Sequence, residues 1–328
     1  MKKAVMIVCA DQGNVSSISN RLKKPFLKLG WQAHTFNYRM WQMHRFGITR
    51  AIVNQALISE ALSVKPDLLL VFKGESINEG VIKQISNAGI TTACWTMDDP
   101  FGEHARFNKI RNRNEYDYFF CFDKYYIPKL KEDGQPNSHY LPCAVDPEIH
   151  YEQMNWFDRK EKYEVSFVGS HCNKREKFFR ELQNYDLSIW GYRWKKVKGA
   201  LNKRVYPNVF KADKSLTDTN MTCAIFNQSK INMNHHSIQS RQGYNLRTFE
   251  IPATKSFQLV EYFEGIEDLF KVGHEIACYK NIEEAKEMIR YYLEHAGLRE
   301  SIANKGYQRV VKDHTFDNRI KTILEVIK

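Results

Sequence analysis

The chain has 328 residues, of which 43% are hydrophobic and 27% charged, and its formal net charge at pH 7 is +11. This length exceeds what one hydrophobic core usually organises, so two domains of about 150 residues each are expected. The longest apolar runs, such as Ala4–Ala10, fall far short of the about 20 residues that a membrane-spanning helix needs, which excludes a transmembrane segment. Seven scattered cysteines without a CxxC pair argue against a disulfide framework or a zinc site, and a reducing cytoplasm fits best.

The positive charge implies an acidic partner, which could be nucleotide phosphates, an anionic polymer, a membrane surface or nucleic acid. Basic residues gather modestly in two stretches, Arg106–Arg113 and Arg193–Arg204, each with an aromatic neighbour. Such stretches are more often solvated helix faces or loops than binding sites. Charge alone therefore does not choose among the partners.

Short apolar runs alternate with helical patterns through the first 145 residues. We expect strands at 4–9, 32–36, 67–72, 91–96, 116–122 and 139–141, and helices at 16–29, 49–63, 77–88 and 124–131. Repeated βα units predict a parallel, doubly wound sheet, whose ligands bind at the carboxyl ends of the strands. The residues that follow each strand are therefore the first candidates for a site.

A polar stretch without clear period, Asp146–Lys162, interrupts this rhythm and is a candidate linker. A second βα series follows, with strands expected at 163–168, 186–190, 230–233, 256–260 and 276–279, and helices at 173–182, around 250, and at 282–295, 298–312 and 317–327. The pattern predicts an α/β protein of two βα domains, residues 1–150 and 151–314, with a cleft between them.

The first chemical signal is an apolar strand that runs into a small-residue turn, Gly169 and Ser170, and then into a basic helix start, Lys174 and Arg175. Backbone N–H groups at such a turn, together with two cations, can bind a diphosphate without a metal. The spacing is not that of a Walker loop, and a plain strand-to-helix connection is the alternative.

The next strand ends at Trp190 and Gly191, which offer an indole ring and an unhindered backbone to a nucleobase. A core aromatic is the alternative for Trp190. Further on, Arg247 and Glu250 are three residues apart at a helix start and therefore share one helix face. A cation beside a carboxylate suits a phosphorylated ribose, whereas an exposed helical ion pair is the alternative.

These pieces together resemble the glycosyltransferase group 1 family, and most closely its branch of CgeB-like spore maturation proteins. The resemblance covers residues 163–328 and rests on FVGSHCNKR, IWGYRW, SKINMNHHS, YNLRTFEIPA and a long C-terminal helical stretch, in the family's order. The N-terminal half adds KPDLLLVFKGESI and CWTMDDP less specifically.

The resemblance implies a GT-B fold, two Rossmann-like domains that face a central cleft, with a C-terminal helix, residues 315–328, that crosses back to the first domain. It implies that Glu250 binds the ribose, with Arg247 as the neighbouring basic position and Asn245 in the same motif. Gly169, Ser170, Lys174 and Arg175 then fall on the diphosphate turn. Gln242 stands where the family's E-x7-E pattern has its first glutamate, and Thr254–Ser256 replaces an AxG turn, so the sugar-facing contacts differ from the family's.

The activity implied is sugar transfer from a nucleoside-diphosphate sugar, with UDP as the favoured nucleotide, to an acceptor hydroxyl on a glycan, protein or polymer. Retention of configuration and no obligatory metal or other cofactor are implied as well. Lys174 and Arg175 would stabilise the departing diphosphate. Asp98 and Asp99, which follow the strand 91–96, are the candidates for orienting the acceptor, with a helix-capping DDP turn as the alternative.

Several other residues and functions stay open. Lys73–Glu75 and Asp11–Asn14 follow strands and could meet the acceptor, or be simple loops. His235 and His236 are adjacent and lack a third ligand, which favours structural histidines over a metal site. A GT-B nucleotide-sugar epimerase and a non-catalytic nucleotide- or polyanion-binding protein are the alternative functions, and modified phage DNA is an alternative acceptor.

Overall fold

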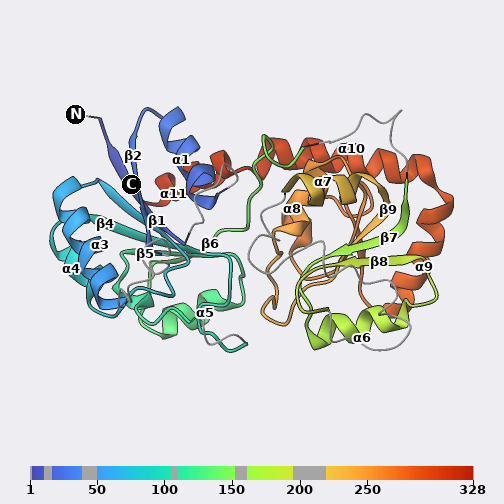
Figure 1. The fold of residues 1–328 in the computed structure, drawn as a ribbon, viewed down its shortest axis with the longest axis horizontal. Coiled ribbons are helices and arrows are strands. Elements are labelled where there is room, and N and C mark those ends of the chain that lie inside the picture. Colours follow the sequence, from blue (N-terminus) through green and yellow to red (C-terminus); the bar gives the residue numbers. More distant parts are fainter. Residues whose placement is uncertain are drawn as a thin grey trace. The chain divides into compact units, whose positions relative to one another are not determined.

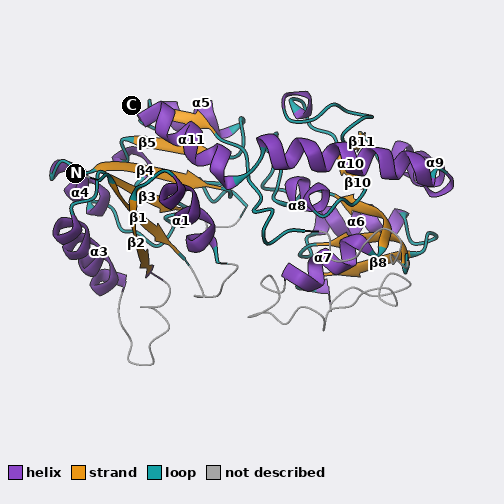
Figure 2. Cartoon of the chain, turned by 90° about the horizontal axis from the view of Figure 1, so that it is seen from above, coloured by secondary structure: helices purple, strands orange, loops and turns teal. Residues whose placement is uncertain are grey.

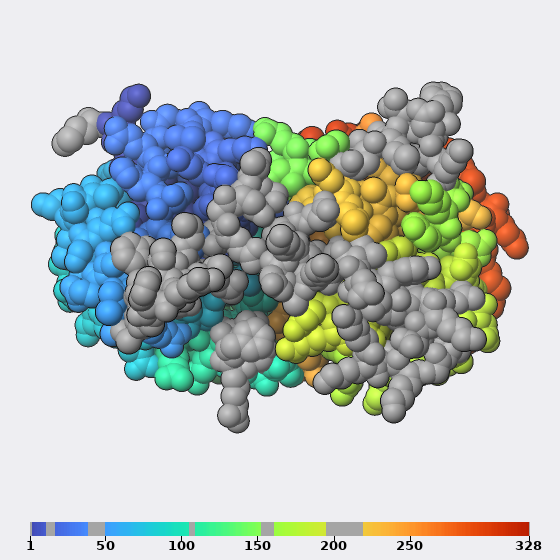
Figure 3. Space-filling view, in the orientation of Figure 1, coloured from blue at the N-terminus to red at the C-terminus, as the bar shows by residue number. Residues whose placement is uncertain are grey.

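The computed structural model describes residues 2–10, 17–38, 50–104, 109–151, 161–194 and 219–327. These form two compact units, each with its own parallel sheet (Figure 1). The first unit comprises Met1–Cys143, Gln239–Gly243 and Phe316–Lys328, and the second comprises Ala144–Ile238 and Tyr244–Thr315. The chain thus changes unit at Cys143, seven residues before the boundary expected at 150, and it returns briefly to the first unit at residues 239–243. Figure 3 gives the same view as a surface, coloured along the chain.

The first unit is a six-stranded parallel sheet in the order β2-β1-β3-β4-β5-β6. The strands are β1 (Ala4–Cys9), β2 (Gln32–Asn37), β3 (Leu68–Phe72), β4 (Thr91–Thr96), β5 (Tyr118–Cys121) and β6 (Ser138–Tyr140). The helices are α1 (Ile18–Lys28), α3 (Arg50–Val64), α4 (Val81–Asn87), α5 (Tyr126–Glu132) and α11 (Phe316–Ile327), with a 3₁₀ turn, η2 (Arg113–Glu115). Every residue of β3 is buried, as expected of a strand covered by helices on both faces (Figure 2).

The second unit is a five-stranded parallel sheet in the order β11-β10-β9-β7-β8. Its strands are β7 (Tyr163–Val168), β8 (Leu187–Trp190), β9 (Ser229–Asn234), β10 (Gln258–Glu261) and β11 (Ala277–Tyr279). Its helices are α6 (Asn173–Glu181), α7 (Thr219–Asn227), α8 (Arg247–Ala253), α9 (Ile282–Glu294) and α10 (Ala296–Asp313), with a 3₁₀ turn, η6 (Ile266–Asp268). The sequence pattern predicts each of these strands to within a few residues but misses α7.

A buried polar side chain, Asn232 of β9, joins the layers of the second unit. Its amide accepts a hydrogen bond from the Ser166 hydroxyl at 2.9 Å and donates to the carbonyl oxygens of Phe226 and Phe257, each at 3.1 Å. Its neighbours in β9, Ile231 and Met233, face the other side of the sheet, where they join an apolar core with Phe167, Phe179 and Leu259. Because the buried amide is fully hydrogen-bonded, it fixes β7, α7 and the start of β10 against one another rather than weakening the core.

The C-terminal helix α11 belongs to the first unit. Phe316 packs edge-on against Trp95 of β4 at 5.8 Å, and the Arg319 guanidinium donates to the carbonyl oxygens of Pro142 and Cys143. Lys28 of α1 pairs with Asp317 at 2.8 Å. In the part of the chain that the structure describes, neither this helix nor any other has the length and apolar character needed to cross a bilayer.

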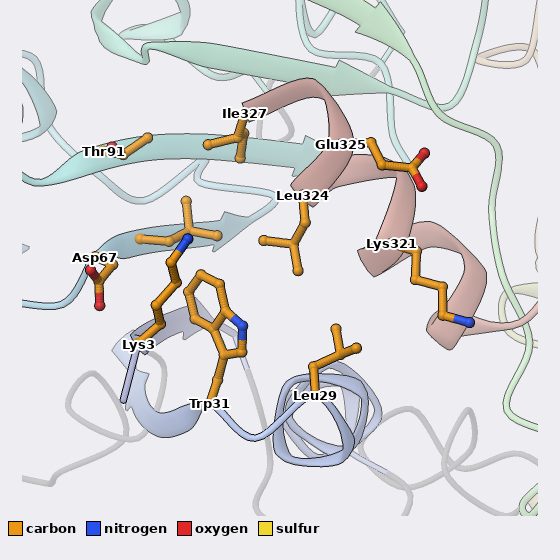
Figure 4. A pocket seen from close by; sticks show the side chains of 10 residues that line it. Lys3, Leu29, Trp31, Asp67, Thr91, Lys321, Leu324, Glu325 and Ile327 are labelled. Carbon is orange, nitrogen blue, oxygen red and sulfur yellow. The ribbon is translucent and has the colours of Figure 1, made fainter. Parts of the chain in front are cut away.

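A cavity of about 740 Å³ opens between α11 and the amino-terminal ends of β1, β3 and β4. Figure 4 shows Lys3 and Trp31 together on one side of it and Leu324 of α11 on the other. The Lys3 ammonium lies over the Trp31 ring, 5.4 Å from its centroid. The cavity is therefore at the end of the sheet opposite the strand ends where the predicted site residues of this unit lie.

Candidate functional site

The strand ends of the second unit gather the predicted residues. Because β7, β8, β9 and β10 are parallel neighbours, their carboxyl ends lie along one edge of the sheet. These strands end at Val168, Trp190, Asn234 and Glu261. The segments that follow them supply Gly169, Gly191, His235 and the loop after Glu261.

The turns after β7 and β8 pack backbone against backbone. A Cβ atom at Gly191 would lie 1.9 Å from the carbonyl oxygen of Gly169, and one at Gly169 would lie 2.8 Å from the Phe167 ring. The Trp194 indole N–H donates to the same Gly169 carbonyl at 2.8 Å. Both glycines are therefore required by close packing, which leaves a small-residue turn at the sheet edge.

Trp190 lies in the core and not at the edge. Its side chain is 3% exposed, packs with Val168, Phe226 and Ile251, and meets the Tyr163 ring edge-on at 4.8 Å. The predicted contact between this indole and a nucleobase is therefore wrong, because the ring is enclosed by apolar side chains. Trp190 places Gly191 at the edge.

Arg175 ties two of the strand ends together. Its guanidinium donates to the carbonyl oxygen of His235 at 2.9 Å through Nε and to that of Ser170 at 2.8 Å through Nη1. It also stacks over the Phe167 ring, 5.1 Å from the centroid. Burial lowers the pKa of this guanidinium from its usual value. Arg175 thus organises the turn after β7 and adds positive charge to it.

Lys174 is held by a carboxylate that sequence reasoning missed. Its ammonium lies 2.7 and 2.9 Å from the two carboxylate oxygens of Glu261, the last residue of β10. The backbone N–H of His236 donates to the same carboxylate at 3.0 Å. Burial alone would raise the pKa of Glu261, but the His236 hydrogen bond and the nearby charge of Lys174 lower it to about 2. The sequence signal available for Glu261 was a charged residue directly after the expected strand 256–260.

The adjacent histidines are enclosed by rings. His235 stacks on Phe178, with centroids 4.1 Å apart, and its Nδ1 lies 2.9 Å from the Tyr279 hydroxyl. His236 is fully buried against Tyr244 and Phe263. Burial lowers the pKa of His235 to about 3 and lowers that of His236 as well, so both rings are neutral at pH 7. Among the described residues, no group of three or more His, Cys, Asp or Glu side chains could hold a metal ion.

Arg247 and Glu250 pair on one face of α8, and the pair is not a surface one. Glu250 is only 4% exposed. Arg247 donates to the Glu250 carboxylate through Nη1 and to the carbonyl oxygen of Val168 through Nε, at 3.2 Å for the latter. The guanidinium therefore joins α8 to the end of β7, next to Gly169.

Asn245 fixes the start of α8. Its side-chain amide exchanges hydrogen bonds with that of Asn234, at 2.9 and 3.2 Å, and its Oδ1 accepts the backbone N–H of Thr248 at 3.3 Å. Asn234 is the last residue of β9 and donates to the Thr248 hydroxyl at 3.0 Å. Asn245 thus caps the helix that carries Arg247 and Glu250 and attaches it to the sheet.

His150 is a second residue that the sequence pattern missed. It lies in the stretch taken as a linker, is 3% exposed, and places its Nε2 3.2 Å from the Glu250 carboxylate. Its Nδ1 lies 3.2 Å from the carbonyl oxygen of Asp146. Both neighbours of the ring are hydrogen-bond acceptors, whereas a neutral imidazole carries one N–H.

In the first unit, Asp98 and Asp99 follow β4 but have different environments. Asp99 is fully buried and accepts the backbone N–H groups of Phe101, Gly102 and His104 at 2.9 to 3.3 Å. It therefore forms the capping turn that was the alternative for it. Asp98 is partly exposed, and its two oxygens meet the Lys73 ammonium at 2.5 Å and the Gln239 amide at 3.1 Å.

Residues 239–243 complete this edge of the first unit. The buried carboxylate of Asp123, just after β5, accepts the backbone N–H groups of Arg241 and Gln242 at 2.8 and 3.2 Å. A Cβ atom at Gly243 would lie 2.6 Å from that of Asp123. Gln242, which stands where the resemblance expects a glutamate, is thus fixed beside Asp123 through its backbone.

Some predicted residues cannot be placed. Asp11–Asn14 and most of the basic stretch 193–204 lie outside the described residues, as do residues 105–108 of the other basic stretch. Lys73 is described, and it has a positive φ of 74°, followed by Gly74 at 89°. This left-handed turn directs the Lys73 side chain to Asp98.

Comparison with known proteins agrees with this geometry. A family model described as "Glycosyl transferase-like" matches residues 174–325. The spore protein CgeB of Bacillus subtilis (strain 168) is 21% identical over 268 residues, which are 77% of this chain and 80% of that protein.

Among solved structures, sucrose-phosphate synthase from Thermosynechococcus elongatus is similar, with a TM-score of 0.67, 9% identity and coverage of 99% of this chain and 98% of that one. HepE of Anabaena, in complex with UDP and glucose, has a TM-score of 0.66 and 10% identity over 100% and 99% of the two chains. At such identities these structures show the fold, two parallel α/β units of the GT-B type, as expected from the sequence. Residues 174–325 thus match the glycosyl transferase-like family model, the chain is similar to CgeB over most of its length, and its two units have the GT-B fold of glycosyltransferases.

Proposed function

We propose that the protein moves a sugar from a nucleoside-diphosphate sugar, with UDP as the nucleotide, to an acceptor hydroxyl, with retention of configuration and without an obligatory metal. The observation that carries this proposal is the buried Arg247–Glu250 pair beside the Gly169 turn. Burying this ion pair costs desolvation energy, which makes the pair a candidate functional group, and it lies beside the strand end that would hold phosphates.

In this proposal, the donor lies along the carboxyl edge of the second unit. Glu250 accepts the ribose hydroxyls, which are donors of the kind that a carboxylate binds. The Ser170 backbone and the Lys174 ammonium face the diphosphate, while Arg175 holds that turn in shape. Gly169 shapes the turn instead, because its N–H donates to the Trp190 carbonyl oxygen and its own carbonyl oxygen accepts from Trp194. The UDP and glucose in the HepE complex, a protein of the same fold, support UDP as the nucleotide.

The chemistry rests on electrostatic stabilisation of the leaving diphosphate. As the bond from the sugar to the diphosphate breaks, negative charge grows on the phosphate oxygens, and fixed cations lower the barrier. Lys174 and Arg247 lie at the edge, each paired with a carboxylate, Glu261 and Glu250, and Arg175 adds positive charge from within the turn, where it bonds to two carbonyl oxygens.

The acceptor end belongs to the first unit. Asp98 is the carboxylate we propose for orienting the acceptor hydroxyl, because it is partly exposed and is held by Lys73 and Gln239. Asp99 has both oxygens engaged by backbone N–H groups, so it shapes the turn and does not meet the acceptor. A glycan, protein or other polymer is the proposed acceptor, with modified DNA as a less favoured one.

We place the reaction in the cytoplasm. All seven cysteines are free thiols and six of them are buried, which suits a reducing compartment. Cytoplasm is also where a nucleotide-sugar donor and a reduced enzyme would meet.

The test begins with the purified protein and UDP-, GDP-, ADP- and TDP-glucose, each assayed by thermal shift and by release of the nucleoside diphosphate. We expect UDP-glucose to raise the unfolding temperature and Glu250→Ala to abolish that rise while the variant stays folded. Stabilisation by none of the four donors contradicts the proposal. Sugar products formed without acceptor, analysed by mass spectrometry and NMR, would instead indicate an epimerase, and binding without turnover a non-catalytic protein.

A further inference from the structure

In the Lys174–Glu261 contact, the Glu261 carboxylate is bound by donors that are typical of an anion-binding site. Two carboxylate oxygens of Glu261 receive the Lys174 ammonium at 2.7 and 2.9 Å, and one of them also receives the His236 backbone N–H at 3.0 Å. An ammonium and a main-chain N–H at a strand end are the groups that bind phosphate oxygens in proteins. Glu261 therefore lies beside the position that a diphosphate oxygen would take in the proposed function, and shares Lys174 with it.

Lys174 and Glu261 differ in how freely their side chains can move. Glu261 is the last residue of β10, paired in register with Tyr279 of β11, so its backbone is fixed by the sheet. Lys174 reaches it by a flexible four-carbon side chain from the first turn of α6, and its ammonium also lies over the Phe263 ring, 5.6 Å from the centroid. Movement of the ammonium toward a ligand is thus easy, while the carboxylate stays in place.

The neighbouring groups keep the carboxylate charged. His235 and His236, the titratable residues beside Glu261, are neutral because burial lowers their pKa values. The His236 backbone N–H and the Lys174 ammonium, both in contact with the carboxylate, lower the pKa of Glu261, so it stays ionised near neutral pH. A permanent negative charge therefore sits beside the cation proposed to bind the diphosphate.

We propose that Glu261 is a specificity-determining residue that lets the site hold a nucleoside-diphosphate sugar but release the free nucleoside diphosphate. This inference rests on the proposed function. The free diphosphate gains about one negative charge at pH 7 when its terminal phosphate is no longer esterified, since the second pKa of such a phosphate is about 6. A fixed carboxylate repels that extra charge and competes with it for Lys174, so product leaves more readily than donor.

The decisive measurement is the dissociation constant of UDP and of UDP-glucose, by calorimetry, for the wild type and for Glu261→Gln, which keeps the shape and removes the charge. We expect the substitution to tighten UDP by about tenfold and UDP-glucose by no more than about threefold. Glu264→Gln is the matched control, because Glu264 is an exposed carboxylate three residues away and its loss changes the net charge equally. It should leave both constants unchanged.

Weaker binding of both ligands to Glu261→Gln, or equal tightening of both, overturns the inference. If Glu261→Gln does not fold, the dissociation constants of UDP and UDP-glucose are compared in the wild type at two pH values instead. Lowering the pH from 7.5 to 5.5 protonates the terminal phosphate of UDP but not the UDP-glucose ester, so the ratio of the two dissociation constants should fall toward one, and a constant ratio contradicts the proposal. Failure of the wild type to bind either ligand would contradict the proposed donor, and with it this inference.

Discussion

The imidazole of His150 lies 3.2 Å from the carboxylate of Glu250, and both side chains are at least 95% buried. The contact connects the stretch Asp146–Lys162, which the sequence pattern predicts to be a linker, to α8, the helix that carries the proposed ribose ligand. The contact fixes the orientation of the buried Glu250 carboxylate.

His150 is expected to position Glu250. Replacement by Phe removes the ring nitrogen that lies 3.2 Å from the Glu250 carboxylate and should weaken UDP binding by about tenfold or more, the usual effect of losing a polar contact to a charged group. Replacement by Gln restores a donor near the Nε2 position, and we expect affinity within about threefold of the wild type. Calorimetry with UDP well below the unfolding temperature measures both. Equal losses in the two variants would mean that His150 only fills space.

Substitutions at Asp98 and Asp99 should have different effects, one on the rate of transfer and the other on stability. Asp98→Asn leaves the fold and donor binding intact but should lower the rate of transfer to acceptor by at least about a hundredfold if Asp98 orients the hydroxyl or takes its proton. Asp99→Ala leaves three backbone N–H groups in a buried turn without their acceptor, each worth about 1 to 3 kcal/mol. Thermal unfolding and transfer kinetics distinguish the two. A stable Asp99→Ala enzyme with a slow transfer step would reverse the roles assigned here.

His235 should make stability depend on pH. Its pKa is about 3 in the folded protein and about 6.5 when unfolded, so the unfolded chain binds more protons between these values. Stability therefore falls as pH drops from about 6.5 toward 3, by at most about 1.4 kcal/mol per pH unit from this residue. Glu261, whose pKa falls to about 2 on folding, adds a loss below about 4.3.

The variant His235→Phe keeps the stack on Phe178 and removes the titrating group. Urea unfolding at pH 5 and 7 should show a smaller difference between the two pH values for this variant than for the wild type. An unchanged difference would place the pH dependence in other residues.

Gly191→Ala should be severely destabilising, by about 3 kcal/mol or more, because the added methyl meets backbone atoms of Gly169 that cannot move aside. Gly273→Ala is the matched control. Gly273 also has a positive φ, of 79°, but nothing lies within 4 Å of an added Cβ, so only backbone strain of about 1 kcal/mol is expected. Chemical denaturation of both variants gives the comparison. Similar costs at the two positions would mean that the turn after β8 yields easily.

Local patterns predict much of this protein. Unbroken apolar runs such as Leu68–Phe72 predict buried parallel strands, because a strand covered on both faces needs no polar residues. The helix start at Arg247 places Glu250 on the same face by helical periodicity alone. Helix α7 is missed because the polar residues of TNMTCAIFN hide its period, and tertiary burial of Cys223 and Phe226 decides it.

Sequence by itself thus determined the two parallel βα units and the order of motifs at their strand ends, since both follow from local periodicity and from turn residues next in the chain. Tertiary structure alone decided which side chains face one another. Trp190 lies in the core and Asp99 closes a turn, while His150 contacts Glu250 and Glu261 contacts Lys174. Those contacts link residues as much as 100 positions apart, and no local pattern encodes a distance that only the packing of helices on a sheet creates.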